Sequence, residues 1–300
     1  MKAFLAQLRR ELWEHPVLYL SPIVIGAIVL VWALWLATSP DGLELAFVIE
    51  DDDIGFADRT RLVTTIVLVL LAPLFMLPTV AVIASYLLNC LGTERRDRSI
   101  LFFKSLPISD VTTVLAKLTT ALLLAPILAL AGLLITELGV TVVVGASSAG
   151  MLWDPSQLLA AWALAAYTVI AFMLWHAPTW CFLLAVSAWA RRATLLWACS
   201  PLLVILVERS LTGRSSLGRL LSAHWQGFWS TALEHRLSIP LGQNPFPEML
   251  GEVDVASTTN LWSWMDPVGL LTSPTLWAGL AVAVGFTAAA VALRRYRDDS

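Results

Sequence analysis

The side chains with chemical potential in this 300-residue chain are few and lie inside long apolar stretches. Ionisable groups within membrane-spanning helices are costly, and each is a candidate functional residue. We predict a substrate pathway at Glu137 and His176, with Glu137 contacting substrate or a proton. The structural alternatives stay open: a hydrogen bond or a wet-interface position for Glu137, and a satisfied core position for His176. Lys117 is expected to extend its ammonium group to the membrane surface.

No known catalytic or metal-binding pattern occurs in the sequence. The H-E-x-x-H, G-x-S-x-G and G-x-x-x-x-G-K-[ST] motifs are absent, and the four histidines lack paired ligand spacing. The acidic run at 50–53 could bind a hard cation weakly, but a solvated loop explains it as well. We therefore expect a protein that is not itself an enzyme and that holds no metal or cofactor of its own.

The composition is that of a membrane protein. Hydrophobic residues make up 58% of the chain, charged residues only 14%, and the mean hydropathy is +0.77. Soluble domains average about 45–50% apolar and about 25% charged residues. These values exclude a cytosolic globular enzyme and a disordered chain, and a net charge of −3 offers no basic surface for nucleic acid.

Apolar stretches long enough to cross a bilayer predict an all-α, polytopic membrane protein with six transmembrane helices. A bilayer core about 30 Å thick requires roughly 20 helical residues. The six stretches are 17–37, 62–91, 114–144, 158–190, 193–207 and 275–293. The fifth is the weakest, because its charge-free part is the shortest.

Arginine and lysine residues set the expected orientation. They gather before the first span, after the second and fourth spans, and after the last span, whereas the first outer loop is acidic. Because short cytoplasmic loops carry the positive charge, we predict that both termini are cytoplasmic. Three arginines in the fifth loop conflict with this scheme, but long loops obey the rule poorly.

The chain divides into four regions. Residues 1–16 form an amphipathic helix that lies in the inner interface, and 17–207 hold the first five spans. Residues 208–274 form a structured extracytoplasmic region, and 275–300 form the sixth span and a cytoplasmic tail. We expect a helix in 208–274, either at the outer leaflet or as a lid packed on the spans.

The cytoplasmic segment 99–109 combines a preceding charged cluster with exposed apolar residues. Its candidate docking residues are Ser99, Ile100, Leu101, Phe102, Phe103, Leu106 and Pro107. Apolar side chains rimmed by charge mark a surface that binds a partner. The alternative is that this segment folds back onto the inner leaflet as an interfacial helix.

Two segments resemble bacterial permease subunits of the ABC-2 type. The first is Arg10-Glu11-Leu12-Trp13-Glu14-His15 before the first span. The second, after the second span, comprises Glu94-Arg95, Ser99-Ile100-Leu101-Phe102, Lys104-Ser105-Leu106-Pro107-Ile108-Ser109 and Val114-Leu115-Ala116-Lys117. The resemblance implies an exporter-type membrane domain in the bacterial inner membrane. Residues 99–109 would be its coupling helix, and the N-terminal helix with Glu11 would be the connecting helix. Glu94 would make a polar contact at the foot of the second span.

The resemblance also implies partners. A separate ATP-binding cassette ATPase would bind ATP and magnesium and dock on the inner side, and a second permease subunit, identical or paralogous, would complete a pathway. Membrane lipid is expected around the spans, and no nucleic acid is expected. The alternative function is a non-transporting membrane scaffold or sensor with an outer binding domain.

Overall fold

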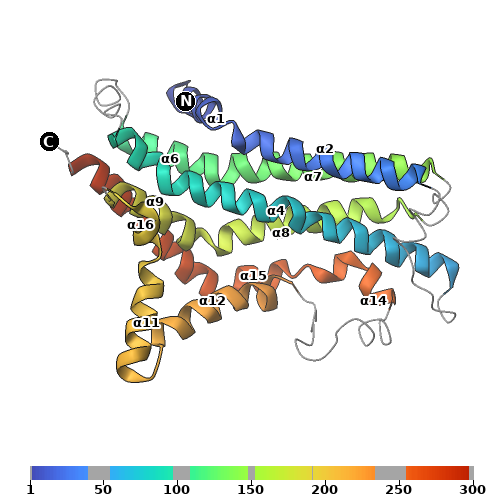
Figure 1. Cartoon of the computed structure of the whole chain (residues 1–300). Coiled ribbons are helices and arrows are strands. Elements are labelled where there is room, and N and C mark those ends of the chain that lie inside the picture. Colours follow the sequence, from blue (N-terminus) through green and yellow to red (C-terminus); the bar gives the residue numbers. More distant parts are fainter. Residues whose placement is uncertain are drawn as a thin grey trace.

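The structure is a computed structural model that describes residues 2–39, 55–96, 109–147, 153–190, 192–233 and 255–296. These residues are almost entirely helical, as an all-α polytopic membrane protein requires. Most of the long helices run side by side in one bundle, and both chain termini lie at the same end of it (Figure 1). This end is called the base of the bundle below.

Within the described residues, five helices are long and apolar enough to span a membrane. They are α2 (Val17–Thr38), α4 (Phe56–Arg96), the continuous helix formed by α6 (Asp110–Thr119), η1 (Thr120–Leu124) and α7 (Ala125–Gly145), α8 (Gln157–Trp175), and α16 (Pro274–Tyr296). Because a helix rises about 1.5 Å per residue, the 41 residues of α4 exceed the thickness of a bilayer core and must project beyond it.

The fourth predicted span forms two helices instead of one. The first, α8, ends at Trp175, and α9 (Ala177–Trp189) begins after His176, which has φ −90° and ψ 11°. Pro178 occupies the first turn of α9, where its missing N–H is tolerated but a continuing helix is not. The joint therefore places His176 between two helices.

The prediction of one continuous helix over 193–207 is wrong. This stretch forms α10 (Thr194–Ala198) and the start of α11 (Ser200–Thr212), neither of which is long enough to span a membrane. Pro201 in the first turn of α11 explains the break at Cys199, and Gly213 ends α11 with a left-handed φ of 67°. Figure 1 shows α11 extending away from the bundle.

The expected helix in 208–274 is α12 (Ser216–Ala232), which packs on α8. Trp175 Nε1 donates to the His224 carbonyl at 2.8 Å, and Tyr167 Oη donates to the Ala232 carbonyl at 2.7 Å. Three short elements follow: α14 (Val255–Thr259), the 3-10 helix η3 (Leu261–Trp264) and α15 (Pro267–Thr272). Because α12 contacts α8, the structure favours a lid packed on the spans over a helix that only lies on the outer leaflet.

Helices α2 and α7 approach closely because glycines line their contact. A Cβ atom on Gly132 would lie 2.8 Å from Pro22 Cβ, and one on Gly139 would lie 2.5 Å from Leu30 Cδ2. Small residues allow this close packing between helices in lipid, where apolar burial gives little drive for association. The pair forms one wall of the bundle.

Candidate functional site: a buried ion network at the base of the bundle

Glu94 lies two residues before the end of α4 and binds two cations from other helices. Its Oε2 accepts from Arg294 Nη1 of α16 at 2.5 Å, and its Oε1 lies 3.0 Å from Lys117 Nζ of α6. The three residues are 6%, 6% and 1% exposed, respectively. Such buried charges persist only when they are paired, so these contacts fix three helices relative to one another.

Glu11 extends the network to the N-terminal helix, α1 (Lys2–Glu14). Lys117 Nζ donates to Glu11 Oε1 at 2.7 Å, and Tyr86 Oη of α4 donates to Glu11 Oε2 at 2.7 Å. Glu11 is 3% exposed because the amphipathic α1 turns this position toward the bundle. Lys117 therefore bridges two carboxylates, one on α1 and one on α4.

His15, immediately after α1, packs beside this carboxylate. Its ring meets the Tyr86 ring edge-on at 4.8 Å between centroids, and its Nε2 lies 3.9 Å from Glu11 Oε2. Burial lowers the pKa of His15 below 6.5, although Glu11 acts in the opposite direction. At neutral pH the imidazole is thus mostly neutral, and Lys117 supplies the cation for Glu11.

Asp110 closes the network on the other side of the segment 97–108. Arg294 Nε donates to Asp110 Oδ1 at 3.1 Å, so one guanidinium holds both Glu94 and Asp110. Asp110 begins α6, whose N-cap Ser109 accepts from Thr112 N at 3.1 Å. The chain therefore enters and leaves 97–108 through residues tied to the same arginine.

The network joins two of the predicted docking residues, Glu11 and Glu94, through Lys117. The other predicted docking residues, Ser99, Ile100, Leu101, Phe102, Phe103, Leu106 and Pro107, lie outside the described residues. The carboxylates of Glu11 and Glu94 are both buried against this chain's own cations, so within the described structure they position helices. A partner that pressed on 99–109 would act on them indirectly.

Sequence reasoning missed most of this network. Lys117 does not extend to the surface as expected: it is held in the interior by Glu11 and Glu94. In the sequence, Arg294 stands out only as part of the positive charge after the last span. One feature of the sequence could have revealed the network: Lys117 lies inside an apolar span, and a buried lysine requires a carboxylate partner.

The structure places Glu137 in the interior of the bundle, away from this network. It lies on α7 and is 1% exposed, and its Oε2 has no hydrogen-bond partner among the described residues. Its backbone carbonyl accepts from Thr141 Oγ1 at 2.8 Å. The side chain faces neither the network nor the groove described below.

His176 lies in an aromatic cluster at the joint between α8 and α9. Its ring centroid lies 4.2 Å from Phe172 and 4.5 Å from Trp225, and its Nδ1 lies 3.2 Å from the Phe172 carbonyl. It does not meet Glu137. These contacts place His176 in the interior, where its Nε2 has no hydrogen-bond partner among the described residues, and the substrate pathway stays a prediction.

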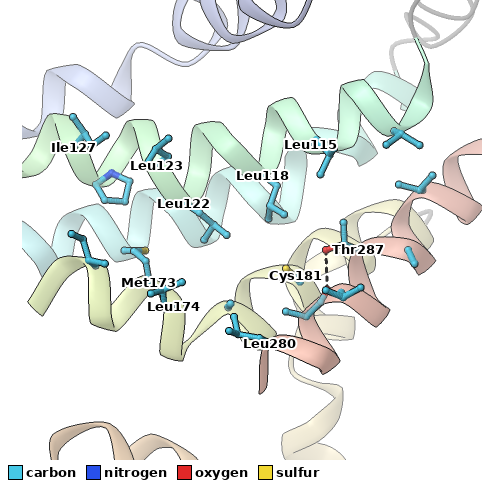
Figure 2. A pocket seen from close by; sticks show the side chains of 18 of the residues that line it. Leu115, Leu118, Leu122, Leu123, Ile127, Met173, Leu174, Cys181, Leu280 and Thr287 are labelled. Atoms are coloured by element: carbon cyan, nitrogen blue, oxygen red, sulfur yellow. Dashed lines mark hydrogen bonds between the residues drawn. The ribbon is translucent and has the colours of Figure 1, made fainter. Parts of the chain in front are cut away.

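An open apolar groove of about 1000 Å³ lies between the α6–α7 helix, the α8–α9 pair and α16. Figure 2 shows Leu118 and Leu122 of the first helix facing Met173, Cys181 and Leu280 across it. The groove was not predicted, because its lining comes from three separate parts of the sequence that share only their apolar character.

A metal site is not needed to explain the acidic groups near α1. One ligand atom each from Glu11, Glu14 and His15 lies within 4.8 Å of the others. However, Lys117 and Tyr86 already bind Glu11, and Arg10 forms an ion pair with Glu14. The acidic run at 50–53 lies outside the described residues.

Comparison of the chain with protein-family models, with curated proteins and with solved structures found no match.

Proposed function

We propose that this chain is the permease subunit of an ATP-binding cassette exporter of the ABC-2 type, with six spans and both termini in the bacterial cytoplasm. The proposal rests on the resemblance of two segments and on the network that connects them. Glu11 belongs to the first segment and Glu94 to the second, and Lys117 bridges them at 2.7 and 3.0 Å. This bridge is the single observation that supports the proposal most.

The network gives a physical path for coupling. Residues 99–109 would dock on a separate ATPase subunit, which binds ATP and magnesium. Force on this segment would reach Glu94 and Asp110 at its two ends, and from there α16 through Arg294. Lys117 would carry the same displacement to α1. Helices tied by buried ion pairs move as a unit, which suits a rocking motion of the spans.

The fifth crossing requires more than one element. In this proposal α10, α11 and α12 together return the chain to the outer side, since α9 ends near the base and α16 must run back to it. A second permease subunit, identical or paralogous, would then complete a pathway.

An ATP-binding cassette ATPase gene adjacent to the gene of this chain would favour the proposal, its absence would favour the scaffold or sensor alternative, and co-purification with such an ATPase tests the docking. Phe102→Asp and Leu106→Asp should abolish recovery of the ATPase, because each places a charge in an apolar docking surface. Phe56→Asp is the matched control: it adds the same charge at the exposed far end of α4 and should leave recovery unchanged. Normal recovery with all three variants would contradict the docking assignment and favour the scaffold or sensor alternative.

A further inference from the structure

The apolar groove has a wall made almost wholly of hydrocarbon. Leucines of the α6–α7 helix face Leu280 of α16, as Figure 2 shows. The hydroxyl of Thr287, one of the few polar groups in the lining, is satisfied inside its own helix, where it donates to the Ala283 carbonyl at 2.8 Å. Nothing in the middle of the groove can therefore orient a polar ligand.

Apart from Cys181 and Thr287, the polar side chains of the lining stand at one end only. Arg295 and Tyr296, the last two described residues of α16, line the groove at the base of the bundle. The Arg295 guanidinium lies over the Tyr296 ring at 5.4 Å from its centroid, and both side chains are exposed. The groove is thus apolar along its length and cationic at its mouth.

Arg295 differs from the arginine next to it. Arg294 turns into the bundle and binds Glu94 and Asp110, whereas Arg295 forms no ion pair within the described part of the chain. Asp110, the nearest carboxylate in sequence to the groove residue Val111, is engaged by Arg294. Among the described residues, the charge at the mouth of the groove is therefore positive and not paired with a carboxylate.

The groove is about as long as a bilayer core is thick, so it is long enough to hold the acyl chains of a lipid from the inner leaflet. Its lining on the α6–α7 helix runs from Val111 to Leu130, about 28 Å at about 1.5 Å per residue. A bilayer core is about 30 Å thick, and anionic lipids gather at the cytoplasmic leaflet, where the charge pattern places this end of α16. Exposed rim residues such as Leu123 and Ile127 would then contact acyl chains instead of water.

We propose that this groove binds an anionic phospholipid of the surrounding bilayer, with an acyl chain against Leu118, Leu122 and Leu280 and the headgroup at Arg295. This goes beyond the proposed transport function, because it holds whether or not the chain docks an ATPase. It assigns the adjacent arginines different tasks: Arg294 holds helices together and Arg295 holds a lipid.

Native mass spectrometry tests the proposal on the full chain reconstituted with equal amounts of phosphatidylglycerol and phosphatidylcholine. The wild type should retain phosphatidylglycerol in preference. Arg295→Gln should lower that preference about fivefold, the effect of one cationic side chain near a membrane surface. Leu123→Trp, which fills the groove from its exposed rim, should reduce retention of both lipids.

Two controls separate the groove from general lipid contact. Arg209→Gln and Leu203→Trp change exposed residues of α11 in the same way and should leave retention unchanged. Equal loss in the controls, or an unchanged lipid preference in Arg295→Gln, would overturn the proposal. A third variant tests whether a second copy of the chain fills the groove: Leu123→Cys in a background where Cys90, Cys181 and Cys199 are replaced by Ala. A disulfide between two such chains would also overturn the proposal, because a second copy would then occupy the groove.

Discussion

Glu94 and Arg294 lie 200 positions apart in the sequence, yet their side chains meet at 2.5 Å in the interior of the bundle. This contact ties the end of the second predicted span to the end of the last. Lys117 and Asp110 extend it to the start of the third span, and Glu11 extends it to the N-terminal helix. Four elements at the base of the bundle are thus held by alternating charges.

Lys117→Met should strongly destabilise the protein. The substitution leaves Glu11 and Glu94 buried with one partner fewer, which costs about 3–5 kcal/mol for a broken buried pair. Thermal unfolding in detergent would measure the loss. The double variant Lys117→Met with Glu11→Gln should lose less than the sum of the two single variants, because the residues are coupled. Strict additivity would mean that the pair does not interact.

Arg294→Gln and Arg295→Gln form a matched pair on one helix. Arg294→Gln removes the partner of Glu94 and Asp110 and should lower the unfolding temperature. Arg295→Gln removes an exposed charge and should change stability by less than about 0.5 kcal/mol. Because both variants remove one positive charge, a difference in their stability cannot come from the total charge of the chain. Equal shifts in the two variants would contradict the different environments of these residues.

Helix prediction from the sequence succeeded where one apolar run forms one helix. The first predicted span, 17–37, is α2 almost to the residue, and the all-α polytopic class is confirmed. Over 158–190 and 193–207 the apolar run continues through Pro178 and Pro201, so hydropathy alone could not mark the breaks at His176 and Cys199. The count of six crossings remains a prediction.

The site was less predictable than the helices. Glu11 and Glu94 were singled out from the resemblance, but their partners Lys117 and Arg294 lie 106 and 200 positions away. No spacing rule in a single sequence joins such distant positions, because the pairing depends on how the helices pack. The same reason hid the groove lined by α6–α7, α8–α9 and α16.

Gly132→Ala should destabilise the contact between α2 and α7. The added Cβ would lie 2.8 Å from Pro22 Cβ and 3.3 Å from Phe75 Cε1, so the helices must separate. Overpacking of this kind costs about 1–3 kcal/mol. Gly285→Ala on α16 is the control: outside its own helix, no atom of the described residues lies within 4 Å of the new Cβ, and this variant should be as stable as the wild type or more stable. A neutral Gly132→Ala would show that the helices pack less closely.

Acid should loosen the turn between α11 and α12. Glu208 accepts from Ser216 N at 2.7 Å and from Leu217 N at 3.2 Å, and these hydrogen bonds lower its pKa below the usual 4.5. The stabilisation is therefore present above pH 4.5 and is lost as the pH falls through the lowered pKa.

Hydrogen exchange of these two amides as a function of pH checks this prediction. After correction for the intrinsic rates, their protection should decrease at acidic pH in the wild type and be low at every pH in Glu208→Gln. Protection that is independent of pH in the wild type would contradict the role of the carboxylate.

The most direct measurement of the central claim is hydrogen exchange of the whole chain with and without the proposed ATP-binding cassette ATPase subunit. If residues 99–109 dock on that subunit, amides in this segment should exchange at least tenfold more slowly in the complex, while those of α12 stay unchanged. Unchanged exchange over 99–109 in the presence of saturating ATPase would contradict the account.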